Sequence, residues 1–195
     1  VDVVVAVVAS QPRCCRVGVV VDAVVVVAGN IADDGLAADI AGDGIAAVVL
    51  HDLDGTAVGV VMSVNVESLF ITAKAVVPHM KAANYGRIIS ASSINAYQGA
   101  FGQANYCASK AAIVRFTHSL CKEVGKYNIT VNAVAPGFIK SEMSDSMPDE
   151  VIEVGIAMIP VKRIGTPEDM GYAYLFLASK EAGFVSGHTP VSYTH

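Results

Sequence analysis

The fold is decided by Gly86-Arg87-Ile88-Ile89-Ser90-Ala91-Ser92-Ser93, taken together with Tyr106-Cys107-Ala108-Ser109-Lys110 further along the chain. The apolar residues of the first segment predict a short buried strand, with Ser93 at its carboxyl end. From the second segment to Val124, apolar residues recur every four positions and predict a helix over 106–124 with one apolar stripe: Ala108, Ala112, Phe116, Leu120 and Val124. Together the two segments predict an α/β unit.

A second strand is predicted over 129–135, where Pro136-Gly137 ends an apolar run. In open α/β sheets, ligands bind at the carboxyl ends of the strands. We therefore expect Ser93, the start of the helix and Pro136-Gly137 to meet at one edge of one sheet.

Tyr106 and Lys110 are spaced to share one face of their helix. Alone, such a pair is usually part of a solvated surface. Beside Ser93 it suggests proton transfer: a free phenol has a pKa of about 10, and a neighbouring ammonium stabilises the phenolate and lowers that value. We expect Tyr106 to exchange a proton with a carbonyl or alcohol oxygen that Ser93 orients.

Residues 60–187 resemble the classical short-chain dehydrogenase/reductase family. The matching segments are Val64-Asn65-Val66, the strand that ends in Ser92-Ser93, Asn105-Tyr106-Cys107-Ala108-Ser109-Lys110, Val131-Asn132-Ala133-Val134-Ala135-Pro136-Gly137, residues 160–169 and Phe176-Leu177-Ala178-Ser179. The resemblance implies an α/β fold: a Rossmann-type doubly wound parallel sheet in three α/β/α layers, as one domain over 1–195. It also implies NAD(P)(H)-dependent interconversion of a carbonyl and a secondary alcohol by hydride transfer.

The resemblance further implies roles for individual residues. Asn65, Ser93, Tyr106 and Lys110 would be catalytic, with Asn65 holding a water that relays protons to Lys110. Tyr106 and Lys110 would also contact the cofactor, the latter at the nicotinamide ribose. The carboxamide would be held by Pro136, Gly137, Ile139 and Ser141.

Two of these segments have a purely structural alternative. Asn65 could be the N-cap of a helix over 66–80, because asparagine is favoured there. Residues 136–141 could be a strand-ending turn followed by a serine N-cap. We favour the cofactor role for residues 136–141 because they follow the strand after the Tyr-Lys helix.

The first third of the chain departs from the family. A strand is predicted over 3–8, but no glycine follows before Gly18, where a glycine-rich turn should approach the pyrophosphate. Runs over 24–27 and 46–50 resemble the second and third strands, and Asp52 matches the residue that flanks adenine. The fourth strand has no counterpart, and Ala28-Gly29 only mimics its turn.

Two explanations of this departure compete: a truncated relative, or an incomplete sequence. Fourteen of the first thirty residues are valine, and such monotony specifies packing poorly. Residues 187–195 likewise stand where the family has a last strand ending in Asp-Gly-Gly. We favour an incomplete sequence, which an intact mass near 20.2 kDa would contradict.

A few residues narrow the choice of cofactor and of substrate class. No acid follows the presumed second strand at Gly29-Asn30, and Arg13 could meet a 2′-phosphate, so we expect NADP(H) ahead of NAD(H). Residues 102–106 and 159–165 resemble 3-oxoacyl-thioester reductases acting on acyl-carrier-protein or coenzyme A substrates. Hydroxysteroid, sugar or polyol dehydrogenases remain alternatives, as does a non-catalytic scaffold that binds no dinucleotide.

Composition excludes several other classes. The net charge of −5 gives no electrostatic support for a nucleic-acid partner. No run of eighteen uncharged apolar residues is present, so we expect no membrane span. The cysteines and histidines lack metal-site spacing, so we expect no metal and a cytoplasmic protein with reduced cysteines.

Three further elements are expected around the site. Residues 141–160, with a helix from Asp149, predict a substrate lid that is apolar inside and acidic outside, or else a surface helical hairpin. Thr166-Pro167-Glu168-Asp169 predicts a capped helix start. The helices over 66–80 and 106–124 carry apolar residues outside their main stripes, Ile113 and Val114 among them, which predicts a homodimer or homotetramer built on a four-helix interface.

Overall fold

The computed structural model describes residues 4–9, 23–28, 56–141, 144 and 147–192. Its centre is a parallel sheet of β1 (Val4–Ala9), β2 (Ala23–Ala28), β3 (Gly86–Ala91) and β4 (Ile129–Val134), in that spatial order. The registers align Val4 with Ala23, Val24 with Arg87 and Gly86 with Ile129. Every described strand pair is parallel, as predicted for a doubly wound fold.

The place of β2 corrects one expectation. The run over 24–27 was assigned to the second strand, and the fourth strand was thought to have no counterpart. In the usual strand order 3-2-1-4-5-6, the fourth strand lies between the first and the fifth. Here β1 corresponds to the first strand, and β3, which precedes Ser93, to the fifth. Since β2 lies between β1 and β3 and pairs with both, it occupies the fourth position and leaves no gap beside β3.

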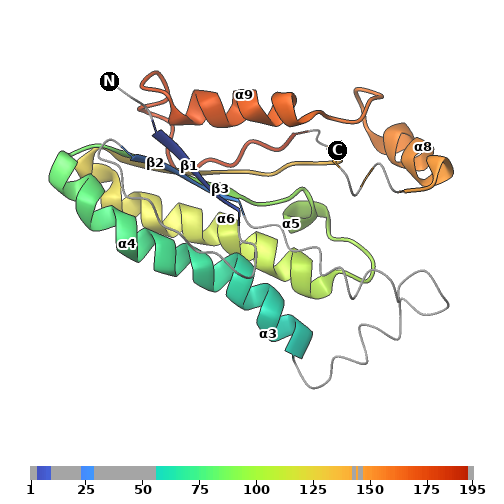
Figure 1. Cartoon of the computed structure of the whole chain (residues 1–195), viewed down its shortest axis with the longest axis horizontal. Helices are drawn as coiled ribbons and strands as arrows, with labels where there is room; N and C mark the ends of the chain where they lie inside the picture. Colours follow the sequence, from blue (N-terminus) through green and yellow to red (C-terminus); the bar gives the residue numbers. More distant parts are fainter. Residues whose placement is uncertain (1–3, 10–22, 29–55, 142–143, 145–146, 193–195) are drawn as a thin grey trace.

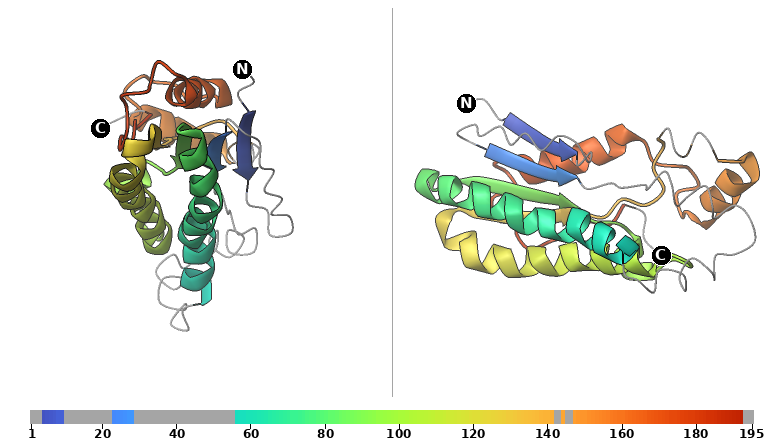
Figure 2. Two further views of the ribbon diagram at one scale, coloured as in Figure 1. Left: turned by 90° about the vertical axis from the view of Figure 1, so that its left-hand side faces the viewer. Right: turned by 60° about the horizontal axis from the view of Figure 1, so that its bottom comes forward.

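Helices cover both faces of this sheet (Figures 1 and 2). On one face lie α6 (Ala104–Val124) and a continuous helical stretch made of α3 (Thr56–Met62), the π-helical turn η1 (Ser63–Glu67) and α4 (Ser68–Ala83). On the other lies α9 (Pro167–Ala178). The short α5 (Asn95–Gln98) and α8 (Asp149–Met158) lie at the end toward which the strands point. The 3₁₀ turn η2 (Gly125–Tyr127) joins α6 to β4.

The core is divided by the pleat of the strands, because successive side chains point to opposite faces. Ile88 packs with Val131, Leu69 and Ile113 on the face covered by α4 and α6. Its neighbour Ile89 packs with residues of α9 on the other face. The near-continuous apolar runs of β3 and β4 follow from this burial on both sides.

The apolar face of α6 is only partly the predicted one. In the expected stripe, Val124 is in the core and Phe116 and Leu120 pack against it, but these two and Ala112 also line a groove shared with α4. Ile113, placed outside that stripe, is only 2% exposed and belongs to the core. The helix carries apolar residues on two sides, and periodicity alone does not say which side the sheet takes.

The helical stretch Val58–Ala83 is long and apolar enough to cross a membrane by length and composition alone, a test that a core helix can also pass. One side of this stretch packs against the sheet. Leu69, Val76 and Met80 pack into the core beside β3 and β4.

Residues 187–192 extend the sheet beyond β4. Gly187 donates to the Val131 carbonyl over 2.7 Å, and Ala133 donates to the His188 carbonyl over 3.0 Å. Ala135 and Val191 form a parallel bridge. This segment therefore takes the position expected for a last strand.

The predicted helix starts near the site are confirmed. Thr166 and Asp169 form a reciprocal capping box at the start of α9. The predicted helix from Asp149 is α8, which exposes its acids but also Val151, Val154 and Met158. The description of that segment as acidic outside therefore captures only part of its surface.

Candidate functional site

Ser93, Tyr106 and Lys110 meet at the carboxyl end of β3. Ser93 lies two residues beyond the strand, and its Oγ accepts a hydrogen bond of 3.2 Å from the Asn95 backbone at the start of α5. The Tyr106 phenol lies near the Ser93 side chain. The Lys110 Nζ lies 5.5 Å from the centroid of the Tyr106 ring. The structure thus brings together three of the four residues expected to be catalytic.

The burial of Tyr106 determines its acidity. Burial raises the pKa of this phenol, and the neighbouring Ser93 side chain only partly opposes the rise. This is the opposite of the expected depression by Lys110. Because burial disfavours the charged phenolate, Tyr106 carries its proton at neutral pH.

Lys110 is almost completely buried, with 1% of its surface exposed. Its Nζ donates to the Ala91 carbonyl over 3.0 Å, at the last residue of β3. Burial lowers the pKa of Lys110 to about 8, because the charged form loses hydration. A buried cation that titrates near neutrality is typical of functional sites.

The backbone around this centre is held from two sides. The Ser92 hydroxyl donates to the Lys110 carbonyl over 2.9 Å. The Ile94 amide donates to the Pro136 carbonyl over 2.9 Å, which joins the end of β3 to the loop after β4. The convergence expected from the sequence is therefore present between Ser93, the start of α6 and Pro136.

Asn65 lies in the π-helical turn η1, so its alternative role as an N-cap is wrong: the chain is already helical from Thr56. Its amide nitrogen donates back to the Val61 carbonyl over 3.1 Å. Its Oδ1 is buried and has no hydrogen-bond partner among the described residues. The turn packs against α6, and π-turns occur frequently at functional sites.

Residues 136–141 form a loop beside the segment that precedes α9. Ile139 forms a parallel bridge with Gly165, in which Lys140 donates to the Gly165 carbonyl and Gly165 donates to the Phe138 carbonyl. In such a bridge the flanking residues make the bonds, so the Ile139 amide points to the opposite side. The Ser141 Oγ accepts from the Ser144 amide over 3.3 Å, which is the turn-capping geometry of the structural alternative.

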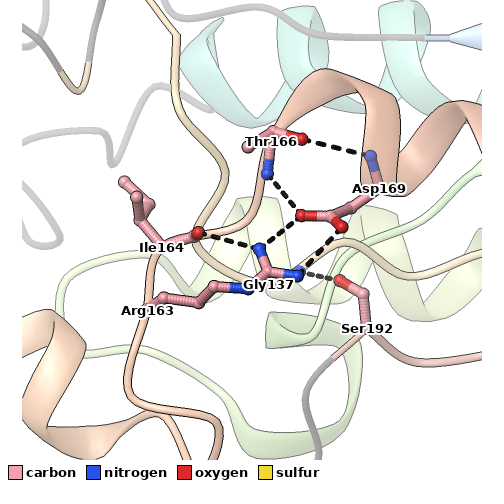
Figure 3. Close-up of polar contacts among 6 residues, drawn as sticks. All are labelled: Gly137, Arg163, Ile164, Thr166, Asp169 and Ser192. Atoms are coloured by element: carbon pink, nitrogen blue, oxygen red, sulfur yellow. Dashed lines mark hydrogen bonds and ion pairs between the residues drawn. The ribbon is translucent and has the colours of Figure 1, made fainter.

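Sequence reasoning missed two anchors of this loop. The Ser192 hydroxyl accepts a hydrogen bond of 2.9 Å from the Gly137 amide (Figure 3). Gly165 supplies the bridge to Ile139. Both lie far from the loop in sequence. The 159–165 segment was noted only for its resemblance to thioester reductases, so no local signal revealed the contact.

The other predicted cofactor residues, Arg13, Asn30 and Asp52, lie outside the described residues. The position of β2 still bears on one of them. Because β2 is not the second strand, the lack of an acid at Gly29-Asn30 no longer argues for NADP(H). Within the described part of the chain, no group of three or more His, Cys, Asp or Glu side chains is placed to hold a metal ion.

The residues present fit a nicotinamide nucleotide. The orphaned Asn65 Oδ1 provides a buried acceptor close to α6, and Lys110 provides a buried donor. The Ile139 amide points away from its own bridge and could serve an external acceptor such as a carboxamide.

Comparison with known proteins agrees with this geometry. The model of the family described as enoyl-(acyl carrier protein) reductase matches residues 18–192. The chain belongs to the short-chain dehydrogenase/reductase family. Its Rossmann-type fold follows from the same finding and from the parallel sheet.

Individual relatives in this family carry related names. The chain is 46% identical over 129 residues to the 3-oxoacyl-[acyl-carrier-protein] reductase FabG of Rickettsia prowazekii, covering 66% of this chain and 54% of the relative. It is 43% identical to nodulation protein G of a Rhizobium species, covering 66% and 53%. The chain thus spans about half the length of the curated relatives it matches.

A solved structure gives the same picture. The crystal structure of a 3-oxoacyl-[acyl-carrier protein] reductase from Brucella melitensis superposes with a TM-score of 0.65 at 35% identity. The match covers 67% of this chain and 49% of that one.

Proposed function

We propose that this protein is an NAD(P)(H)-dependent oxidoreductase that interconverts a carbonyl and a secondary alcohol, with a 3-oxoacyl thioester as its carbonyl substrate. One observation carries the proposal: a half-buried Tyr106 lies beside Ser93, with the Nζ of the buried Lys110 5.5 Å from its ring centroid, at the carboxyl end of a parallel strand. The names of the relatives support the thioester as the substrate class.

Each side chain has a part in the proposed reaction. When bound, the nicotinamide supplies the hydride for reduction or accepts it in oxidation. The Ser93 hydroxyl donates to the substrate oxygen and orients it, while the Tyr106 phenol gives that oxygen its proton. Lys110 and the Asn65 carbonyl oxygen hold water that returns a proton to Tyr106. Because burial keeps Tyr106 protonated, the phenol starts the reduction in its acid form.

The cofactor would be held by Lys110 and Tyr106 at the nicotinamide ribose and by Pro136, Gly137, Ile139 and Ser141 at the carboxamide. For the adenine end we retain Asp52, Asn30 and Arg13 from the sequence. We propose NADP(H) ahead of NAD(H), and this preference now depends on Arg13, which follows β1 as a candidate partner of a 2′-phosphate.

Two measurements test the proposal. Titration of NADPH with the protein should enhance nicotinamide fluorescence, and NADH should bind more weakly. NADPH should then be oxidised with acetoacetyl-coenzyme A faster than with a steroid ketone or a ketose. Faster turnover of either alternative carbonyl would favour a hydroxysteroid or sugar dehydrogenase. If no nucleotide binds, the protein is a non-catalytic scaffold with the family fold.

We also propose self-association through α4 and α6. A groove of about 600 Å³ runs between these helices, lined by Phe70, Val77, Phe116 and Leu120 among others. Phe70 and Phe116 stack edge to face with centroids 4.8 Å apart, yet Phe70 stays 59% exposed. A second copy related by a two-fold axis would cover these rings, as family members commonly oligomerise.

Free Cys107 and Cys121 accord with the proposed cytoplasmic location.

A further inference from the structure

A polar cluster of Arg163, Thr166 and Asp169 joins the end of the 159–165 segment to α9 (Figure 3). The guanidinium donates to both carboxylate oxygens of Asp169, at 2.5 Å and 3.0 Å. A further hydrogen bond of 3.2 Å runs from Arg163 to the Ile164 carbonyl. We call these three residues the latch.

The carboxylate of Asp169 serves two partners at once. It accepts from the Thr166 amide over 2.8 Å, while the Thr166 hydroxyl accepts from the Asp169 amide over 3.3 Å. The Arg163 hydrogen bonds hold the pKa of Asp169 well below its usual range. The pair therefore stays ionised at neutral pH and closes a ring of hydrogen bonds around residues 163–169.

Gly165 lies inside this ring, and it is also the residue that bridges to Ile139. A Cβ added at Gly165 would lie 2.5 Å from the Ile139 Cδ1 and 3.9 Å from the Asp169 Oδ2. The backbone of Gly165 thus touches the latch on one side and the 136–141 loop on the other. Any shift of residues 163–166 moves the bonds to Phe138 and Lys140.

We propose that Arg163 and Asp169 are positioning residues, which hold the 136–141 loop in place through Gly165. This inference rests on the proposed function, in which that loop receives the carboxamide of the nicotinamide. Neither side chain lies in the Ser93-Tyr106-Lys110 centre, so the latch would act on the placement of the nicotinamide rather than on proton transfer.

The exposure of the pair bears on the kind of effect to expect. The Arg163 and Asp169 side chains are 58% and 35% exposed. Exposed ion pairs contribute little to global stability, but a bidentate arginine fork fixes geometry in a way that a lysine does not. Loss of the latch should therefore loosen the loop without unfolding the protein.

Amide hydrogen exchange of the free protein is the first arm of the test. In Arg163→Gln, the Lys140 and Gly165 amides should exchange about tenfold faster than in wild type, since opening of the bridge then needs less free energy. The Ala133 amide in β4 should not change. Arg163→Lys and Asp169→Asn should give intermediate rates, and both keep part of the hydrogen bonding if Arg163→Gln folds poorly. Glu168→Gln is the matched control, because Glu168 is an exposed acid of the same helix turn and its side chain contacts neither Arg163 nor Asp169 within the described hydrogen bonds.

Turnover is the second arm. With NADPH and acetoacetyl-coenzyme A, kcat of Arg163→Gln should fall about tenfold, because a small misplacement of reacting groups slows the chemical step. The primary isotope effect with 4-deuterated NADPH should rise, whereas KM for the thioester should hold. A merely structural role would reduce the active fraction and leave the isotope effect unchanged.

The outcomes separate the two proposals. If the Lys140 and Gly165 amides of Arg163→Gln exchange at the wild-type rate, the proposed role of the latch is wrong. It is also wrong if these amides exchange faster while kcat and the isotope effect stay unchanged. A wild-type protein that oxidises no NADPH contradicts the proposed function instead. In that case the exchange arm still decides whether the latch holds the loop.

Discussion

At the scale of single residues, burial governs the chemistry of this site. Tyr106 and Lys110 are both removed from water, which raises the pKa of the phenol and lowers that of the ammonium. The two shifts favour the neutral form of each group. The shifts also move the two pKa values apart, so Tyr106 keeps its proton while Lys110 releases one more easily than a free lysine.

Tyr106→Phe removes the phenolic oxygen and keeps the ring. We expect the fold and the affinity for NADPH to survive, while turnover falls by at least the ~10²–10⁴-fold typical of a general acid. Steady-state rates and fluorescence titration measure the two quantities. A variant that keeps more than about a tenth of the rate would show that another group supplies the proton.

Lys110→Met tests the cost of the buried ammonium. Burial brings its pKa from 10.5 to about 8, so the folded state binds fewer protons than the unfolded state between these values. Wild-type stability should therefore rise with pH through that window, whereas the methionine variant lacks this rise. Any stability advantage of the variant over wild type at neutral pH should shrink by up to about 3 kcal/mol as the pH rises through that window.

Urea unfolding at several pH values measures this difference. Lys122→Met is the control, because Lys122 is an exposed residue of the same helix. If the free energy of unfolding changed equally with pH in Lys110→Met and wild type, the folded protein would not disfavour the charged form of Lys110.

At the scale of elements, the close approach of α4 to β3 depends on a glycine. A Cβ at Gly86 would lie 2.5 Å from the Met80 Sδ and 2.9 Å from its Cβ. Met80 is itself buried, with 2% of its surface exposed. Little room is left between the first residue of the strand and the last turns of the helix.

Gly86→Ala should consequently destabilise the protein by about 1–3 kcal/mol, the usual cost of overpacking a core. Gly171→Ala in α9 should do the reverse and stabilise by roughly 0.5–1 kcal/mol, because it adds a methyl group to an exposed helix with open space around it. Denaturant unfolding of both variants measures the changes. A Gly86→Ala variant as stable as wild type would contradict the packing of α4 on β3.

At the scale of the whole molecule, the open groove between α4 and α6 should decide assembly. Phe70→Asp puts a charge into the groove and should convert a dimer to a monomer in light scattering. Ile71→Asp is the matched control: Ile71 is 62% exposed but does not line the groove. A wild-type protein that is monomeric and active in dilute solution would refute the interface.

Ile113 is a core residue rather than the interface residue that the sequence predicted. It was expected near the subunit interface, where a charge would dissociate the oligomer. Since it packs in the core with Ile88 and Val131, Ile113→Asp should unfold the protein instead. Circular dichroism separates this outcome from dissociation.

Much of this protein was determined locally by its sequence. The start of α9 follows from Thr166 and Asp169, because a capping box uses only neighbouring atoms. The strand before Ser93 and the helix that carries Tyr106 and Lys110 follow from apolar periodicity, and their chain order predicts where they meet.

Only the tertiary structure decided the features that depend on which distant segments lie together. The place of β2 beside β3 was hidden because a valine-rich run fits any buried position of a parallel sheet. The inward face of α6 depends on the sheet it meets, since both faces are apolar. The direction of the Tyr106 pKa shift depends on burial, which no local pattern of residues specifies. The same holds for the contacts of Gly165 and Ser192 with the loop after β4, because they join residues that chain order alone leaves apart.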